Sequence, residues 1–223
     1  MGPKIKKKTI VLKRDKRVYN KKDPSYEDLC EIIDRNLYIK DVTSNPKKDT
    51  NSLSYIVKSA VSQSDCIKLG HAVESAFSDA VLKLSSLNLK NIKQKNKKGE
   101  KERDHLFCDE KNKIIFYSEL KSNLNLDTEK SKTTYTKCLD IVNELKEEYP
   151  DYEIRWCLFA CRYLLYEDIP SVIKRKYTPI SENVFGVNQY MSMMGINYVF
   201  SEENYVKLLN YIGDKMFKKD LEN

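Results

Sequence analysis

Two acidic residues and a lysine are spaced so that a β-hairpin would place them together. Asp104 precedes a short apolar run at 105–108, and Glu119 and Lys121 end a second apolar run at 113–121. The polar residues between the runs predict a turn, and the β-branched and aromatic residues of the second run favour a buried strand. The segment therefore predicts a hairpin with Asp104 at its open end.

The register of this hairpin decides which side chains become neighbours. If the turn centres between Glu110 and Lys111, or one residue later, paired residues have numbers that sum to about 221–223. Asp104 then lies opposite residue 117, 118 or 119, which brings its carboxylate beside that of Glu119. Side chains two apart on a strand share a face, so Lys121 points the same way as Glu119.

Two neighbouring carboxylates and a lysine predict metal-assisted chemistry on a phosphate. The carboxylates of Asp104 and Glu119 repel each other unless a cation lies between them. Mg²⁺ prefers one or two carboxylates together with water and substrate phosphate oxygens. The Lys121 ammonium could orient or deprotonate an attacking water, or stabilise charge that develops on the phosphate. These are the requirements of phosphodiester hydrolysis.

The elements that must position these residues follow from hydrophobic periodicity. Apolar residues recur with helical spacing on both sides of the hairpin, and a further apolar run predicts a second buried strand. The order of elements predicts an α/β (or α+β) fold with a central mixed β-sheet flanked by helices. The predicted helices cover 26–40, 51–63, 66–88, 129–148 and 202–218, and the predicted strands cover 105–108, 113–121 and 152–163.

The segment Arg103-Asp104 … Glu119-Leu120-Lys121 resembles the signature of the PD-(D/E)xK nuclease superfamily, and the element order resembles that superfamily's αβββαβ core, the restriction-endonuclease-like core. The resemblance implies that Asp104 and Glu119 bind Mg²⁺, that Leu120 offers its backbone carbonyl, and that Lys121 is the catalytic lysine. It also implies a further acidic ligand on the preceding helix, for which Glu74 is the candidate. Arg103 stands where the family often has Pro.

The chain length and its basic character narrow the resemblance to type II restriction endonucleases. That resemblance implies Mg²⁺-dependent, sequence-specific cleavage of double-stranded DNA by a homodimer, with a cognate DNA methyltransferase as companion. We expect a single domain over 1–223, with a basic arm at 1–24, the catalytic core at 66–162, and recognition and dimerisation surfaces at 166–223.

An excess of basic residues suits a nucleic-acid partner. The 223 residues include 40 Lys and Arg against 33 Asp and Glu, a formal net charge of +7. Arg pairs with guanine edges, and Asn or Gln pairs with adenine edges. The candidate DNA contacts lie in the lysine-rich segment 88–103, after the second strand, and in the segment 166–197. They are Lys97, Lys98, Arg103, Asn123, Asn125, Lys130, Lys174, Arg175, Asn188 and Gln189.

Other features exclude several classes of protein. No apolar run is long enough to cross a bilayer, and the basic first residues do not lead into a signal-peptide core, so we expect a cytoplasmic protein that is not secreted. None of the six cysteines forms a C-x-x-C pair, which argues against a structural zinc site and favours reduced thiols.

Two alternative functions remain open. A structure-selective repair or junction nuclease would use the same Asp104, Glu119 and Lys121 but would cut branched DNA without regard to sequence. A non-enzymatic nucleic-acid-binding protein would use its basic arm, and the paired carboxylates would be accidental. Replacing Lys121 with alanine separates these classes, because only a nuclease would lose cleavage.

Overall fold

A five-stranded mixed sheet forms the centre of the protein. The computed structural model describes residues 23–39, 63–92 and 101–218. The strands lie side by side in chain order, with β1 to β3 antiparallel and β3 to β5 parallel. They are β1 (Lys90–Asn91), β2 (His105–Asp109), β3 (Ile114–Lys121), β4 (Glu153–Ala160) and β5 (Val184–Phe185). The predicted α/β class and mixed sheet are confirmed.

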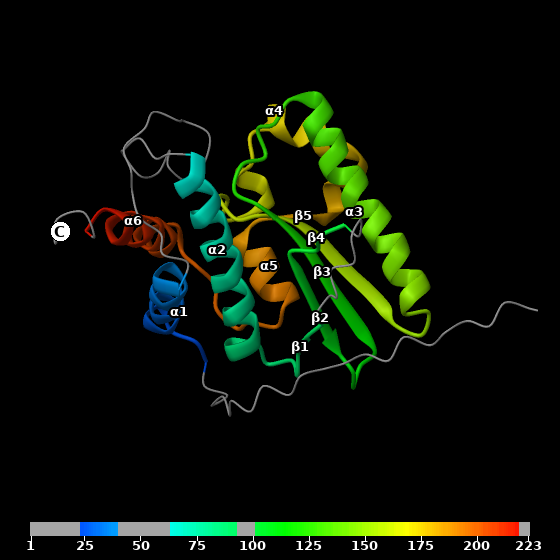
Figure 1. The fold of residues 1–223 in the computed structure, drawn as a ribbon, viewed down its shortest axis with the longest axis horizontal. Helices are drawn as coiled ribbons and strands as arrows, with labels where there is room; N and C mark the ends of the chain where they lie inside the picture. Colours follow the sequence, from blue (N-terminus) through cyan, green and yellow to red (C-terminus); the bar gives the residue numbers. More distant parts are fainter. Residues whose placement is uncertain (1–22, 40–62, 93–100, 219–223) are drawn as a thin grey trace, which may run out of the picture.

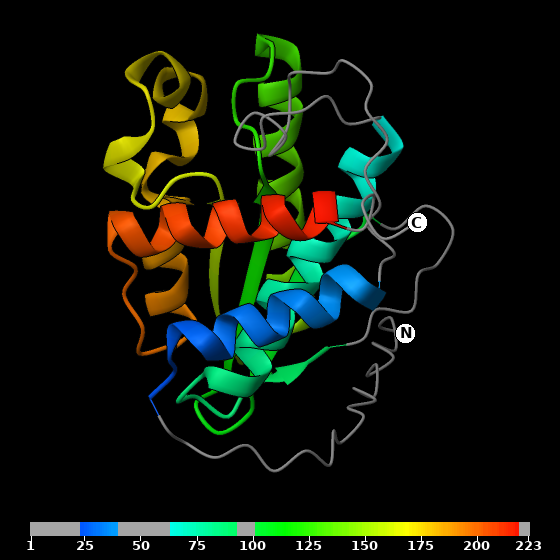
Figure 2. The ribbon, with the colours of Figure 1, turned by 90° about the vertical axis from the view of Figure 1, so that its left-hand side faces the viewer.

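Helices cover both faces of this sheet (Figure 1). One face carries α1 (Tyr26–Ile39), α2 (Gln63–Leu84), α5 (Val187–Met193) and α6 (Glu202–Lys218). The other face carries α3 (Thr128–Glu148), α4 (Ser171–Lys174) and the 3-10 segments η2 (Tyr166–Asp168) and η3 (Arg175–Asn183). Figure 2 shows α1, α2 and α6 in front of the sheet.

The alternation of side chains along the strands produces a separate core on each face. Phe107, Phe116 and Phe159 pack toward α2 and α5, whereas Tyr117 and Leu158 pack toward α3. Seven of the eight β3 residues are buried, which explains why this strand is apolar on both faces. Glu119 is therefore a charged residue in a strand that is buried on both faces.

The turn between β2 and β3 has a local cause. The Asp109 carboxylate accepts hydrogen bonds from the Asn112 backbone N–H at 3.1 Å and from the Asn112 side-chain amide at 2.7 Å. Lys113 follows with φ 53°, in the left-handed region. The resulting register pairs His105 with Ser118 and Asp109 with Ile114, so Asp104 lies level with Glu119. The numbers of paired residues sum to 223, the largest of the predicted values, so the predicted register is confirmed.

The caps of two helices were also predictable. The Asp127 carboxylate accepts the Lys130 N–H at 2.8 Å at the start of α3, and the Ser201 hydroxyl accepts the Asn204 N–H at 3.1 Å at the start of α6.

The two-residue strands β1 and β5 were not predicted. The predicted helix over 51–63 lies outside the described residues except for its last position, as does most of the basic arm.

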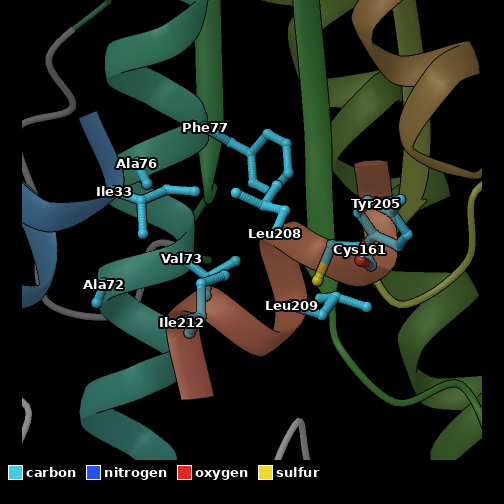
Figure 3. Close-up of a pocket in the computed structure, with 10 residues that line it drawn as sticks. All are labelled: Ile33, Ala72, Val73, Ala76, Phe77, Cys161, Tyr205, Leu208, Leu209 and Ile212. Carbon is cyan, nitrogen blue, oxygen red and sulfur yellow. Dashed lines mark hydrogen bonds between the residues drawn. The ribbon is translucent and has the colours of Figure 1, made fainter. Parts of the chain in front are cut away.

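An apolar cluster supports the end of β3 that carries Lys121. The N–H of Cys161, just after β4, donates to the Lys121 carbonyl at 3.2 Å, and the Tyr205 hydroxyl on α6 donates to the Cys161 carbonyl. Figure 3 shows the small cavity beside these residues, about 30 Å³ in volume. Its lining is Ile33, Ala72, Val73, Ala76, Phe77, Cys161, Tyr205, Leu208, Leu209 and Ile212. A space this small and apolar is a packing gap between helices and holds at most about one or two water molecules.

Two expectations about the environment of the chain can be compared with the structure. Among the described residues, no helix combines the length and the apolar character needed to span a bilayer. The described cysteines form no disulfide, and Cys108, Cys138, Cys157 and Cys161 are buried thiols.

Candidate active site

The Asp104 carboxylate is held against the end of β3. Asp104 immediately precedes β2 and is half-buried. Its Oδ2 accepts the backbone N–H of Leu120 at 2.7 Å. In an antiparallel pair the N–H and C=O of one residue point to the same strand edge, so the Leu120 carbonyl faces the same side as Asp104. The predicted metal donors Asp104 and Leu120 are therefore neighbours.

Glu119 lies beside them and is closed off from solvent. Its side chain is 1% exposed, and its Oε1 lies 2.9 Å from the Lys121 Nζ. The Lys137 Nζ donates to both carboxylate oxygens, at 2.8 and 2.7 Å, and the Tyr117 hydroxyl donates to Oε2 at 3.3 Å. The predicted proximity of Glu119 and Lys121 is confirmed, and Lys137 joins them.

Lys137 was missed at the sequence level, although a signal was present. It lies three residues after Thr134 and four before Ile141, both of which are buried. Positions with this spacing share a helix face, so a lysine at 137 points toward the sheet within an otherwise apolar and small-residue stripe. A charged residue in such a stripe needs a buried partner, and Glu119 supplies it.

The charges at this place are unbalanced. Burial and the neighbouring Glu119 carboxylate raise the pKa of Asp104, although Lys121, the Leu120 N–H and Lys137 oppose the rise. Burial and Asp104 likewise raise the pKa of Glu74. Burial alone would lower the pKa of Lys121, but the Glu119 and Asp104 carboxylates outweigh it and raise that pKa. Three carboxylates thus face two ammonium groups.

His105 connects this group of residues to helix α2. The imidazole is 1% exposed. Its Nε2 lies 2.9 Å from the Glu74 backbone carbonyl, and its Nδ1 lies 3.1 Å from the Ser118 hydroxyl and 2.9 Å from the Tyr190 hydroxyl. Burial lowers the pKa of His105 to about 4, so the ring is neutral at physiological pH. A neutral ring that donates from Nε2 to the Glu74 carbonyl has one lone pair on Nδ1, which accepts from one of the two hydroxyls.

The donor set fits a hard divalent cation. In the described part of the chain, no three side chains of the His, Cys, Asp and Glu types gather closely enough to hold a metal ion. Asp104 and Glu119 offer two carboxylates and Leu120 a carbonyl, which are oxygen donors only. Mg²⁺ is commonly bound by one or two carboxylates, with waters and substrate oxygens completing its shell. Glu74 interacts with Asp104 electrostatically, and its carboxylate lies 3.7 Å from the His71 ring.

Arg103, a predicted DNA contact, pairs with two carboxylates of this chain. Its guanidinium pairs with Glu144 at 3.2 Å and with Glu148 at 3.3 Å, and its side chain is 10% exposed. These contacts connect the last turns of α3 to the residue before Asp104. We interpret Arg103 as a positioning residue for the Asp104 backbone.

Three other predicted DNA contacts lie at the same end of the sheet as Lys121. Asn123 and Asn125 belong to the segment that leaves β3, where the Asn123 side chain accepts the Asn125 N–H at 2.8 Å. Lys176 of η3 donates to the Asn125 side chain at 3.2 Å, which adds a lysine to this surface. Lys130 is 74% exposed beside Asp127 in the first turn of α3.

The remaining predicted contacts differ in their surroundings. Arg175 is exposed, and the Lys174 Nζ lies 4.6 Å from the centre of the Tyr166 ring. The side chain of Asn188 exchanges two hydrogen bonds of 2.9 Å with the Phe200 backbone. The Gln189 side-chain oxygen accepts the N–H groups of residues 166 and 186. These two amides connect α5 to adjacent segments. Lys97 and Lys98 lie outside the described residues.

Comparison of the chain with protein-family models, with curated proteins and with solved structures gives no match. The fold is accordingly described by its five-stranded mixed sheet and the helices that cover both faces.

Proposed function

We propose that this protein is a Mg²⁺-dependent endonuclease that hydrolyses phosphodiester bonds of double-stranded DNA at specific sequences, as type II restriction enzymes do. The observation that carries the proposal is the hairpin register, which sets Asp104 level with Glu119 while Lys121 lies 2.9 Å from the Glu119 carboxylate. The order α2, β1, β2, β3, α3, β4 supports it, because it agrees with the αβββαβ order of the PD-(D/E)xK core.

The chain's own residues have distinct roles in this proposal. Asp104, Glu119 and the Leu120 carbonyl would hold Mg²⁺, which supplies a metal-activated water and polarises the phosphate. Lys121 has a raised pKa and is therefore protonated in the unliganded protein. In that state its ammonium can orient the water or stabilise charge on the phosphate. In the protein without metal, Tyr117 and Lys137 contact the Glu119 carboxylate.

The DNA partner is proposed from charge and from position. The net charge of +7 favours a polyanion, and Asn123, Asn125 and Lys130 lie where β3 ends, next to Lys121. A homodimer would place one such site on each strand of a palindromic sequence. A cognate methyltransferase and a cytoplasmic location belong to the same proposal.

One observation favours the structure-selective alternative. Asn188 and Gln189 are candidate DNA contacts, yet their side-chain oxygens accept backbone N–H groups of this chain. Arg103 is likewise occupied by two carboxylates. A nuclease that recognises branched DNA needs no base readers, and it would use the same carboxylates and lysine.

The test is digestion of unmethylated phage DNA and of a four-way DNA junction, each with Mg²⁺ and with EDTA. Lys121→Ala should lower cleavage by about a hundredfold or more while DNA binding persists. Lys207→Ala is the matched control, because Lys207 is an exposed lysine on α6 paired only with Glu203 among the described residues. Mg²⁺-dependent discrete bands support a restriction enzyme, and cleavage of the junction alone supports the alternative. Retained binding with no cleavage of either substrate would refute both.

A further inference from the structure

The Glu119 carboxylate has no room for a metal ion while both lysines contact it. A carboxylate offers about four acceptor sites. Among the described residues, Oε1 lies 2.9 Å from the Lys121 Nζ and 2.8 Å from the Lys137 Nζ. Oε2 lies 2.7 Å from the Lys137 Nζ and accepts the Tyr117 hydroxyl at 3.3 Å. A cation that binds Glu119 must therefore displace one of these donors.

The contacts identify Lys137 as the donor that leaves. The Lys137 ammonium donates to both oxygens, at 2.8 and 2.7 Å, so it takes the position that a chelated cation would take. Tyr117 is fully buried on the same strand as Glu119, and the Lys121 Nζ lies 2.9 Å from Oε1. The Lys137 side chain extends from α3 and is 27% exposed, so its ammonium has a route toward solvent, as has that of Lys121, which is 35% exposed.

The charge balance indicates where the displaced lysine ammonium goes. Asp104, Glu119 and Glu74 carry three negative charges when ionised, against the two positive charges of Lys121 and Lys137. A divalent cation would change the sum at this place from −1 to +1, which matches the single negative charge of a phosphodiester. The ammonium that leaves Glu119 remains beside the site and meets that phosphate.

We propose that Lys137 is a displaceable counter-ion. In the free protein its ammonium occupies the metal position on Glu119, and when Mg²⁺ binds there the ammonium moves to the substrate phosphate. This inference rests on the proposed nuclease function. It predicts that Lys137 weakens metal binding while it assists cleavage, which is the opposite of what a residue that merely supports the site would do.

The experiment measures Mn²⁺ binding to the full chain by electron paramagnetic resonance, together with DNA cleavage. Lys137→Met keeps most of the side-chain length and removes the charge. It should bind Mn²⁺ about tenfold more tightly than the wild type and cleave at least about tenfold more slowly. Lys137→Gln gives a second variant if the first fails to fold, and Lys207→Met is the matched surface control. Unchanged or weaker Mn²⁺ binding by the folded variant would overturn the proposal.

Failure of this inference can be distinguished from failure of the proposed function. If the wild type binds Mn²⁺, and Glu119→Gln abolishes that binding, the metal site exists and only the role of Lys137 is in question. If neither Glu119→Gln nor Asp104→Asn alters Mn²⁺ binding, the metal site itself is refuted, and with it both the nuclease proposal and the role of Lys137.

Discussion

His105→Gln should make the folded protein less sensitive to acid. The imidazole is buried, and it joins the Glu74 carbonyl on α2 to the hydroxyls of Ser118 and Tyr190. A glutamine amide can donate to the carbonyl and accept from the hydroxyls, but it does not titrate. The substitution therefore removes the proton-binding site while it keeps the same types of contact.

The magnitude follows from the pKa of His105. Burial lowers that pKa from 6.5 to about 4, and the Glu74 carbonyl and Glu119 offset only part of the effect. Between these pH values the unfolded chain binds a proton that the folded protein does not, so stability falls as the pH drops from 6.5 toward 4. Each pH unit contributes about 1.4 kcal/mol, which amounts to about 3 kcal/mol over the whole interval.

The assay is urea-induced unfolding at pH 7, 6, 5 and about 4 for the wild type, His105→Gln and His71→Gln. His71 is the matched control because its side chain is 56% exposed. The raised pKa values of Asp104 and Glu74 act in the opposite direction, but they are common to the wild type and His105→Gln and cancel in that difference. His71→Gln also removes the contact of His71 with Glu74, which lowers the Glu74 pKa, so it reports that effect as well as the loss of an exposed imidazole. If the stability difference between the wild type and His105→Gln stays constant from pH 7 to pH 4, His105 is not the buried neutral group described above.

Two further predictions concern the neighbours of His105. Asp104→Asn should stabilise the protein by about 1 kcal/mol at neutral pH and abolish Mg²⁺-dependent cleavage. The sign follows because a carboxyl with a raised pKa disfavours the folded state once the pH exceeds its ordinary value of 3.8. Thermal denaturation and DNA digestion check it, and a less stable variant would contradict it. Arg103→Ala should lower stability by about 1–2 kcal/mol and slow cleavage, with DNA affinity changed by less than about twofold, because Arg103 binds Glu144 and Glu148. A loss of DNA affinity at unchanged stability in a binding titration would instead support the DNA contact predicted from the sequence.

The parts of the fold that were predictable are those set by local pattern. The turn after Asp109, the apolar run that became β3 and the Asp127 cap of α3 each depend on residues near one another in the chain. Because the turn fixes the register, the proximity of Asp104 and Glu119 was predictable as well. Helical periodicity identified α2, α3 and α6 within a few residues of their bounds.

The parts that were missed depend on contacts between distant segments. Lys137 meets Glu119 only because α3 crosses back over the sheet, and helical periodicity does not identify the partner of a lysine. Asn188 and Gln189 have the composition of base readers, yet their oxygens accept backbone N–H groups of neighbouring segments. The strands β1 and β5 have two residues each, too few for a period of two to be visible.

The position of the candidate site along the chain has a consequence for how such a protein can evolve. Asp104, Glu119, Lys121 and Lys137 all belong to one hairpin and the helix that follows it, whereas the chain after β4 contributes none of these side chains. Under the proposed function, exposed positions in residues 162–218 can change without altering these four side chains, whereas Asn123, Asn125 and Lys130 lie on the same stretch of chain as the site. A lineage with this architecture could therefore vary one part of its DNA-facing surface independently of the chemistry and the other part only together with it.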